Sequence, residues 1–354
     1  MNRPLIALHG FAFACMLAIG TDLANAQSGR APALPAHLRD TGLYAAGSMS
    51  AIDPRNMLFS PQYPLWSDGA AKRRWLYLPL GTSIDASNPD AWVFPPGTRL
   101  WKEFSHGRAV ETRFIERLAD GSWRYAAYVW KADGSDAVLA PPEGIAALRL
   151  PGAPGGRYEI PAEADCRACH EGAAVPVLGA SALQLSADRD PLAPHAEAVT
   201  TGHADLRHLA ARGLLRNLPA ALIESPPRIA IATPAARAAL GYLHGNCGHC
   251  HNDAGPLASL DLVLAQGSAA SNVSKALRSM ISYTSRYRPR ASQPISQRVV
   301  PGHPEASVLA LRMQSRNPLT QMPPLGTRMA DEEGLALVVR WIQQDLPTST
   351  EHTP

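Results

Sequence analysis

The sequence predicts an α+β multidomain chain, with a β-rich, sandwich-like N-terminal domain and an all-α C-terminal domain. Three observations predict it. Residues 60–160 hold short runs of aromatic and branched side chains separated by turn signals, which are typical of strands. Residues 233–346 hold two segments whose apolar side chains repeat with helical spacing. Residues 161–232, between these parts, are less regular.

The N-terminal domain should be built from strands around an aromatic core. Asp120-Gly121 lies between two of the expected strands and is a strong hairpin signal, because both residues can take positive φ. Six of the seven tryptophans lie between Trp66 and Trp130, and we expect them to fill the core rather than to bind a substrate. The expected strands are 74–78, 92–94, 99–104, 110–117 and 122–130.

Two helices are expected near the ends of the C-terminal domain. Thr233 is a favourable N-cap for the first, and Pro234 suits its first helical position. Asp331 is the N-cap candidate for the second. Both segments carry an apolar stripe, so the two helices should cross and bury each other. The stripes are Ala239, Leu243 and Cys247 in the first, and Leu335, Val338, Trp341 or Ile342, and Leu346 in the second.

Two copies of the pentapeptide Cys-x-x-Cys-His carry the strongest chemical signal. They span residues 166–170 and 247–251 and use every cysteine except Cys15. Two thiols at this spacing can form thioether bonds to the vinyl groups of one haem, and the adjoining His can bind its iron. The sequence therefore predicts two covalently attached haem c groups, with Cys166, Cys169, Cys247 and Cys250 as attachment residues and His170 and His251 as iron ligands.

Apart from chance placement of a His after both motifs, two other interpretations of the cysteines compete with haem attachment. A zinc site built from two Cys-x-x-Cys pairs needs a gap of about 15–20 residues, whereas most of a domain separates Cys169 from Cys247. A redox disulfide in either motif would be expected in a thioredoxin-like βαβ pattern, and neither motif lies in one. Both interpretations are therefore weaker than haem attachment.

Met322 is the predicted sixth ligand of the second haem. A thioether is a soft, neutral donor that raises the potential of a haem with a His ligand. Pro323 and Pro324 follow it directly and stiffen the loop that would present the sulfur. Met313 and Met329 are the nearby competitors, and a role as a core filler is the alternative for Met322 itself.

The sixth ligand of the first haem is open at this point. No Met occurs between His170 and Met280, and an open sixth position is one alternative. Each lone His is more often a surface or core residue than a ligand. The sequence-compatible candidates are His195, His203, His208, His244, Met49 and Met57.

Several arginines could contact haem propionates. Arg312 is one candidate in the second haem site. Others are Arg286, Arg288 and Arg290, which flank Tyr287. These three could instead meet an acidic redox partner or form a solvated loop.

Residues 233–346 resemble a class I-type c cytochrome. The resemblance implies an all-α cytochrome c-like domain in which His251 and Met322 are the axial ligands. It is carried by residues 246–252 around the second motif, Pro301-Gly302-His303-Pro304, Ser307, Leu309, Arg312, Met322-Pro323-Pro324-Leu325-Gly326-Thr327 and Trp341-Ile342.

The chain from residue 27 onward also resembles an uncharacterised family of exported dihaem c-type cytochromes. The resemblance implies the cofactor, haem c, and the class, a dihaem cytochrome. It does not imply a physiological role. It is carried by Tyr63-Pro64-Leu65-Trp66-Ser67-Asp68-Gly69-Ala70, Lys72-Arg73-Arg74-Trp75, Gly97-Thr98, Trp101-Lys102-Glu103-Phe104 and Glu111-Thr112-Arg113, ahead of Asp165-Cys166.

The first residues are typical of a cleaved signal peptide. Residues 1–3 are basic, residues 4–20 are mostly apolar, and Ala24-Asn25-Ala26 supplies small residues before a cut at Gln27. A lipoprotein cut before Cys15 is the minor alternative. We therefore expect a periplasmic location, with no membrane span in the mature chain. A net charge of +3 favours neither nucleic acid nor a strongly anionic surface as a partner.

Together these features predict a periplasmic dihaem cytochrome that transfers one electron at a time between redox partner proteins, which the sequence does not identify. A dihaem peroxidase or another haem oxidoreductase with an open first haem is the alternative. The expected division is a signal peptide at 1–26, a β-rich domain at 27–160, a first haem-binding region at 161–232, a class I-like cytochrome c domain at 233–346 and a tail at 347–354.

Overall fold

The chain divides into two compact units, Met1–Pro35 and Ala36–Pro354. The expected signal peptide and C-terminal tail lie outside the described residues. No described helix has the length and apolar character needed to span a bilayer. The computed structural model describes residues 32–200, 202–253, 257, 259–266, 269–281, 283–287 and 297–346.

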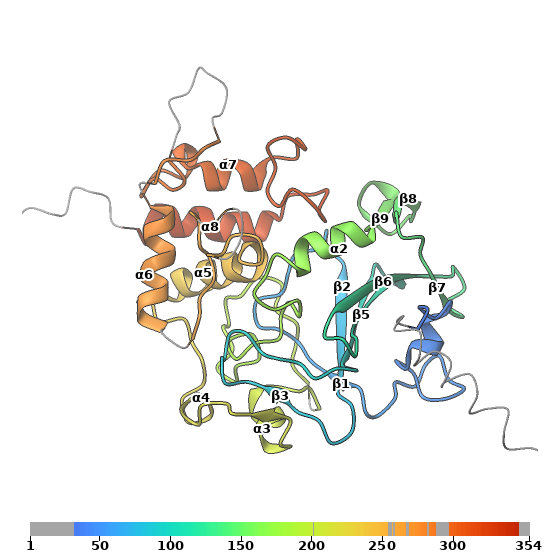
Figure 1. Cartoon of the computed structure of the whole chain (residues 1–354). Coiled ribbons are helices and arrows are strands. Elements are labelled where there is room, and N and C mark those ends of the chain that lie inside the picture. Colours follow the sequence, from blue (N-terminus) through green and yellow to red (C-terminus); the bar gives the residue numbers. More distant parts are fainter. Residues whose placement is uncertain are drawn as a thin grey trace, which may run out of the picture. The chain divides into compact units, whose positions relative to one another are not determined.

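A six-stranded antiparallel sheet is the largest element (Figure 1). Four of the expected strands are confirmed, because residues 74–78, 99–104, 110–117 and 122–130 all fall largely within strands. The expected strand at 92–94 is wrong, since only Val93 forms an isolated bridge, to Asp85. In spatial order the sheet contains β1 (Met57–Leu58), β2 (Ala71–Tyr77), β4 (Arg99–Ser105), β5 (Ala109–Arg117), β6 (Trp123–Trp130) and β7 (Ala137–Leu139).

The expected hairpin at Asp120-Gly121 joins β5 to β6. Gly121 takes a positive φ of 84°, whereas Asp120 does not adopt the left-handed region. Instead, the Asp120 carboxylate accepts hydrogen bonds from the backbone N and the side-chain hydroxyl of Ser122. The turn therefore needs one left-handed residue, and Asp120 contributes through its side chain.

The remaining elements surround this sheet. Two small sheets pair β3 (Ile84–Asp85) with β10 (Leu215–Arg216) in parallel and β8 (Ile145–Arg149) with β9 (Arg157–Ile160) antiparallel. The helices are α2 (Glu163–His170), α3 (Leu206–Ala211), α4 (Ala221–Glu224), α5 (Pro234–Cys247), α6 (Ala269–Met280), α7 (Val308–Gln314) and α8 (Glu332–Gln344), with 3-10 turns at Leu38–Thr41, Pro154–Gly156 and Pro304–Ala306.

The two helices expected near the C-terminal end are present and pack together. The Thr233 side chain accepts a hydrogen bond from the N of Ala236 and caps α5. The Asp331 side chain accepts one from the N of Gly334 and caps α8. Their apolar faces share one cluster of buried side chains. It includes Ala238, Ala239 and Leu243 of α5 and Leu337, Val338, Trp341 and Ile342 of α8.

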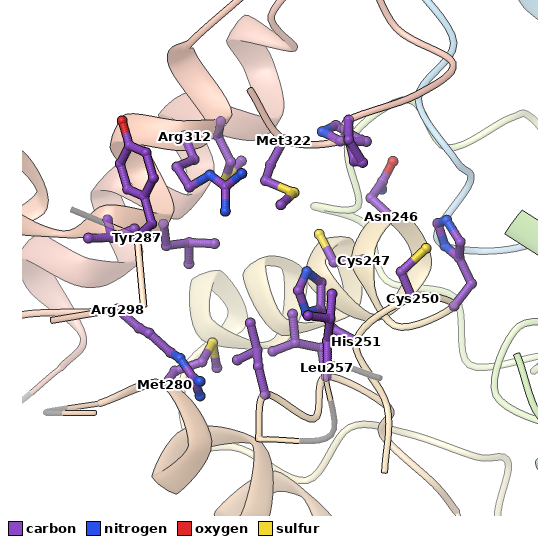
Figure 2. A pocket seen from close by; sticks show the side chains of 18 of the residues that line it. Asn246, Cys247, Cys250, His251, Leu257, Met280, Tyr287, Arg298, Arg312 and Met322 are labelled. Carbon is purple, nitrogen blue, oxygen red and sulfur yellow. The ribbon is translucent and has the colours of Figure 1, made fainter. Parts of the chain in front are cut away.

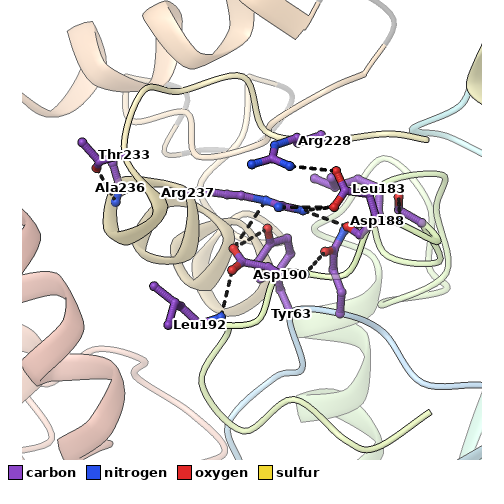
Figure 3. A network of polar contacts seen from close by, with 11 residues as sticks. Tyr63, Leu183, Asp188, Asp190, Leu192, Arg228, Thr233, Ala236 and Arg237 are labelled. Carbon is purple, nitrogen blue, oxygen red and sulfur yellow. Dashed lines mark hydrogen bonds and ion pairs between the residues drawn. The ribbon is translucent and has the colours of Figure 1, made fainter. Parts of the chain in front are cut away.

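Tyr63, from the N-terminal half of the chain, is buried in this helical cluster. A Cβ at Gly241 would overlap the Tyr63 ring, and a Cβ at Gly245 would overlap its backbone. The Tyr63 hydroxyl donates to Asp190 at 3.0 Å, and Arg237 of α5 lies 3.6 Å from the same carboxylate (Figure 3). The segment that begins at Tyr63 is therefore locked onto α5 by shape and by a buried polar network.

The predicted fold class is wrong. The structure is β-rich around the six-stranded sheet, 24% of it is helical, and the described residues show no all-α cytochrome c domain. Tyr63 lies in the helical core, and isolated β-bridges join Ile281 to Val299 and Thr284 to Gln297. Helical spacing in a sequence shows that a face is apolar, not which segment covers it. The domain boundaries at residues 160 and 232 stay a prediction.

The close approach of Tyr63 to α5 gives a first prediction. Gly241→Ala should lower the free energy of unfolding by about 1–3 kcal/mol, because the new methyl group overpacks against the ring. In a Tyr63→Ala background the same change should instead be neutral or stabilise by up to about 1 kcal/mol, since Ala is the better helix former. Urea unfolding of the four proteins measures this. Equal effects of Gly241→Ala in both backgrounds would contradict the packing.

Candidate functional site

A mainly apolar cavity of about 450 Å³ borders both pentapeptides. Its size lies within the range of about 300–1,000 Å³ that is typical of cofactor and ligand pockets. The first motif contributes Cys169 to the wall, and the second contributes most of its residues. Much of the rest of the wall comes from α7 and from the segments that precede and follow it (Figure 2).

The second motif is presented by the end of α5. Cys247 is the last residue of that helix, and its carbonyl accepts hydrogen bonds from the N of Cys250 (3.1 Å) and of His251 (2.8 Å). The helical turn thus continues through the motif. Burial raises the pKa of the Cys247 thiol to about 12 and lowers that of His251 to about 4. His251 is therefore neutral at pH 7, which is the form that binds a metal.

Met322 faces the same cavity as His251. Figure 2 shows its sulfur directed into the cavity, with His251 on the other side. The N of Met322 donates to the carbonyl of Arg312 at 2.9 Å, which fixes the start of the loop. Met313 and Met329 also line the cavity, but Met313 belongs to the helical core and Met329 is 41% exposed. The structure thus brings together the predicted ligand pair.

Arginine side chains lie in the wall of this apolar cavity. Arg312 donates to the carbonyl of Thr320 at 2.9 Å and stacks on the Tyr287 ring at 5.0 Å. Arg298 donates to the carbonyl of Ser259 at 2.6 Å and also lines the cavity. Cations in an apolar wall suit the carboxylates of a haem. Arg286 lines the cavity as well, while Arg288 and Arg290 lie outside the described residues.

The first motif forms the second half of α2, which packs on β6 (Figure 1). His170 Nδ1 donates to the carbonyl of Pro176 at 2.5 Å, and its ring lies 5.3 Å from that of Tyr125. Because Nδ1 carries this hydrogen bond, Nε2 is left as the donor for a metal, a common arrangement of ligating histidines. Burial lowers the pKa of His170 to about 4, so this ring is also neutral at pH 7.

The cysteines of the first motif face different surroundings. Cys166 packs against the apolar cluster under the sheet, and burial raises its pKa to about 11. Cys169 lines the cavity that Cys247 and Cys250 also line. All four motif cysteines are free. Across the described ranges, no three His, Cys, Asp or Glu side chains are placed to hold a metal ion together.

The two motifs lie side by side, which the sequence did not predict. Asn252, directly after the second motif, donates through Nδ2 to the carbonyl of Gly172 at 2.9 Å. A Cβ at Gly172 would lie 3.1 Å from the carbonyl of Ala168 and 3.2 Å from that of His249. About eighty residues separate the motifs along the chain, so no local pattern could have indicated this contact.

Three of the four histidine candidates for the first haem are engaged by other groups. The His195 ring stacks on Trp66, with 4.6 Å between centroids. His208 lies on α3 and is half-buried. The hydrogen-bond partners are Asp331 for His195, Thr200 for His203 and Leu264 for His244.

The two methionine candidates differ in their surroundings. Met57 is buried in β1 and belongs to the cluster that Cys166 packs against. Met49 is half-buried in the segment before β1. The structure therefore brings Met57 into the same cluster as the first motif.

A row of cations crosses the sheet near the first motif. Arg74, Lys102 and Arg113 lie directly opposite one another on β2, β4 and β5. Arg74 pairs with Glu197, and Arg113 with Glu111. Burial, together with these neighbouring cations, holds the pKa of Lys102 well below its usual value.

The haem attachment predicted from the motifs fits this site. The donor set across the cavity is one imidazole and one thioether, with two thiols beside them. Trp66 Nε1 and Arg316 Nε are buried at the cavity and have no acceptor in the described part of the chain. Such donors suit the carboxylates that a haem carries.

Comparisons of the chain with protein-family models, curated proteins and solved structures found no match. The resemblances to c cytochromes therefore rest on the residues quoted above. They stay predictions.

The cation row gives a second prediction. Lys102→Met should raise the free energy of unfolding by about 1–4 kcal/mol at pH 7, because an apolar side chain of similar shape replaces a half-buried amine between two other cations. Because folding lowers the pKa of Lys102, the unfolded chain binds more protons at this residue than the folded chain, so this gain should shrink as the pH rises toward 9. Urea unfolding at both pH values measures it. Lys131→Met, on the exposed Lys131, is the matched control and should change little. A loss of stability in Lys102→Met would contradict the conclusion that the charge on Lys102 destabilises the folded chain.

Proposed function

We propose that the chain is a periplasmic dihaem c-type cytochrome that transfers one electron at a time between redox partner proteins. The observation that carries this proposal is the cavity in which Cys247, Cys250 and His251 lie across from Met322. The second motif, read alone, predicts attachment and one ligand. The cavity places Met322 across from His251, which supports Met322 as the second proposed ligand.

Each group in the cavity has a distinct role in this proposal. Cys247 and Cys250 would hold the haem covalently, and His251 and Met322 would supply donors to its iron. The bound haem supplies the one-electron change between ferrous and ferric iron. Met322 favours the ferrous state because a thioether is a soft, neutral donor.

The cavity wall controls the environment of the redox centre. Leu262, Val299 and Leu309 line it with apolar surface, which excludes water and lowers the local dielectric. Arg298 and Arg312 offset negative charge on the cofactor carboxylates. The protein thus orients the cofactor and sets its electrostatics, while the cofactor carries the electron.

Haem attachment gives a third prediction. The purified chain should retain two haems per polypeptide after denaturation and acid–acetone extraction, because the thioether bonds survive. Cys247→Ser/Cys250→Ser and Cys166→Ser/Cys169→Ser should each retain one. Pyridine haemochrome spectra measure the count.

The control is Ser50→Ala, an exposed position outside both motifs, which should keep two haems. Colourless protein after extraction, or zinc in place of haem, would overturn the proposal.

The ligand pair gives a fourth prediction. Met322→Ala should lower the midpoint potential of one haem by on the order of 0.1–0.3 V, within the range of about 0.8 V that axial ligands span. Loss of the thioether removes the donor that favours ferrous iron. A spectroelectrochemical titration measures both haems. Met329→Leu changes the exposed competitor and should leave both potentials in place. An unaltered titration of Met322→Ala would remove this ligand from the assignment.

A further inference from the structure

The Cys-x-x-Cys-His pattern leaves two positions of the second motif unspecified, and these are Gly248 and His249. Of the two, only His249 has a side chain that can bind a metal. The turn from Cys247 to His251 is helical, since the N of His251 donates to the carbonyl of Cys247. At about 100° per residue, position 249 points roughly 150° away from the mean direction of positions 247, 250 and 251. Its imidazole is therefore directed away from the side chains of Cys247, Cys250 and His251, although it lines the same cavity.

The first motif lies in that direction. The carbonyl of His249 is 3.2 Å from the position of a Cβ on Gly172, two residues after His170. Asn252 ties the same turn to Gly172. His249 also lines the cavity together with Ala168 and Cys169 of the first motif. The imidazoles of His170 and His249 are near enough for a charge on one to act on the other.

The His249 side chain has no other engagement in the described part of the chain. It makes no hydrogen bond or ion pair there, although it is half-buried in an apolar wall. A half-buried imidazole with no protein partner is free to bind a metal through a ring nitrogen. By contrast, His195, His203 and His244 each have a hydrogen-bond partner.

We infer that His249 is the sixth ligand of the haem attached at Cys166 and Cys169, opposite His170. This inference rests on the proposed function, because it requires a haem at the first motif. One helical turn then serves both irons, through His251 on one side and His249 on the other. The first haem is six-coordinate with two imidazoles, and no position stays open for peroxide.

Two other donors lie near the first motif. The charge of Lys102 acts on both His170 and His249. However, its amine rests over the Phe104 ring at 4.8 Å, and it does not line the cavity. Met57 lies in the cluster against which Cys166 packs, and it does not line the cavity. Unlike Lys102 and Met57, His249 lines the cavity together with Cys169 of the first motif.

The experiment compares ferric spin states by electron paramagnetic resonance and near-infrared magnetic circular dichroism. The unmodified protein should show two low-spin haems, one with two imidazole ligands and one with imidazole and thioether. His249→Ala should convert half of the total haem to high spin, and added imidazole should restore the low-spin signal. His203→Ala and Lys102→Met are the controls and should keep both haems low spin.

Three outcomes would overturn the inference. They are two low-spin haems in His249→Ala, a high-spin haem in Lys102→Met, and a high-spin haem in the unmodified protein. The haem count by pyridine haemochrome is measured on every sample. Two covalent haems with an unaltered spin state in His249→Ala would contradict the assignment of His249 and leave the proposed function standing. The absence of covalent haem would contradict the proposed function itself.

Discussion

The packing of Tyr63 against α5 is the constraint on which the arrangement of the site depends. Its ring occupies the space that a side chain at Gly241 would need, and its backbone fills the space beside Gly245. Three residues later, the N of Trp66 donates to Asn246 at 2.7 Å, and Trp66 becomes part of the cavity wall. The segment that leads into the sheet therefore also shapes the end of the helix that carries the second motif.

This contact explains why the two motifs meet. The sheet carries α2 on β6, and the Tyr63 segment fixes α5 relative to that sheet. The hydrogen bond from Asn252 to the carbonyl of Gly172 then joins the two motifs. Since the side chains involved are small or amide-bearing, the backbones of the two motifs approach closely. A bulky residue at position 172 would separate them.

Local patterns predicted the local elements well. Thr233 and Asp331 cap helices where the sequence placed them, because capping depends on neighbours within one turn. Met322 and His251 line one cavity, and their role as iron ligands stays a prediction. The fold class and the contact of Gly172 with Asn252 could not be predicted in this way. Both depend on which distant segment covers a given apolar face, and periodicity carries no information about the partner.

The different directions of the His249 and His251 side chains follow from helix geometry. Two residues apart on a strand, their side chains would share one face; on a helical turn they diverge. Divergence is useful only where a second site lies behind the turn, and here the first motif occupies that place. A glycine or alanine at position 249 would satisfy attachment at the second motif equally well. The imidazole at this position is therefore better explained by the proposed iron binding at the first motif than by haem attachment at the second.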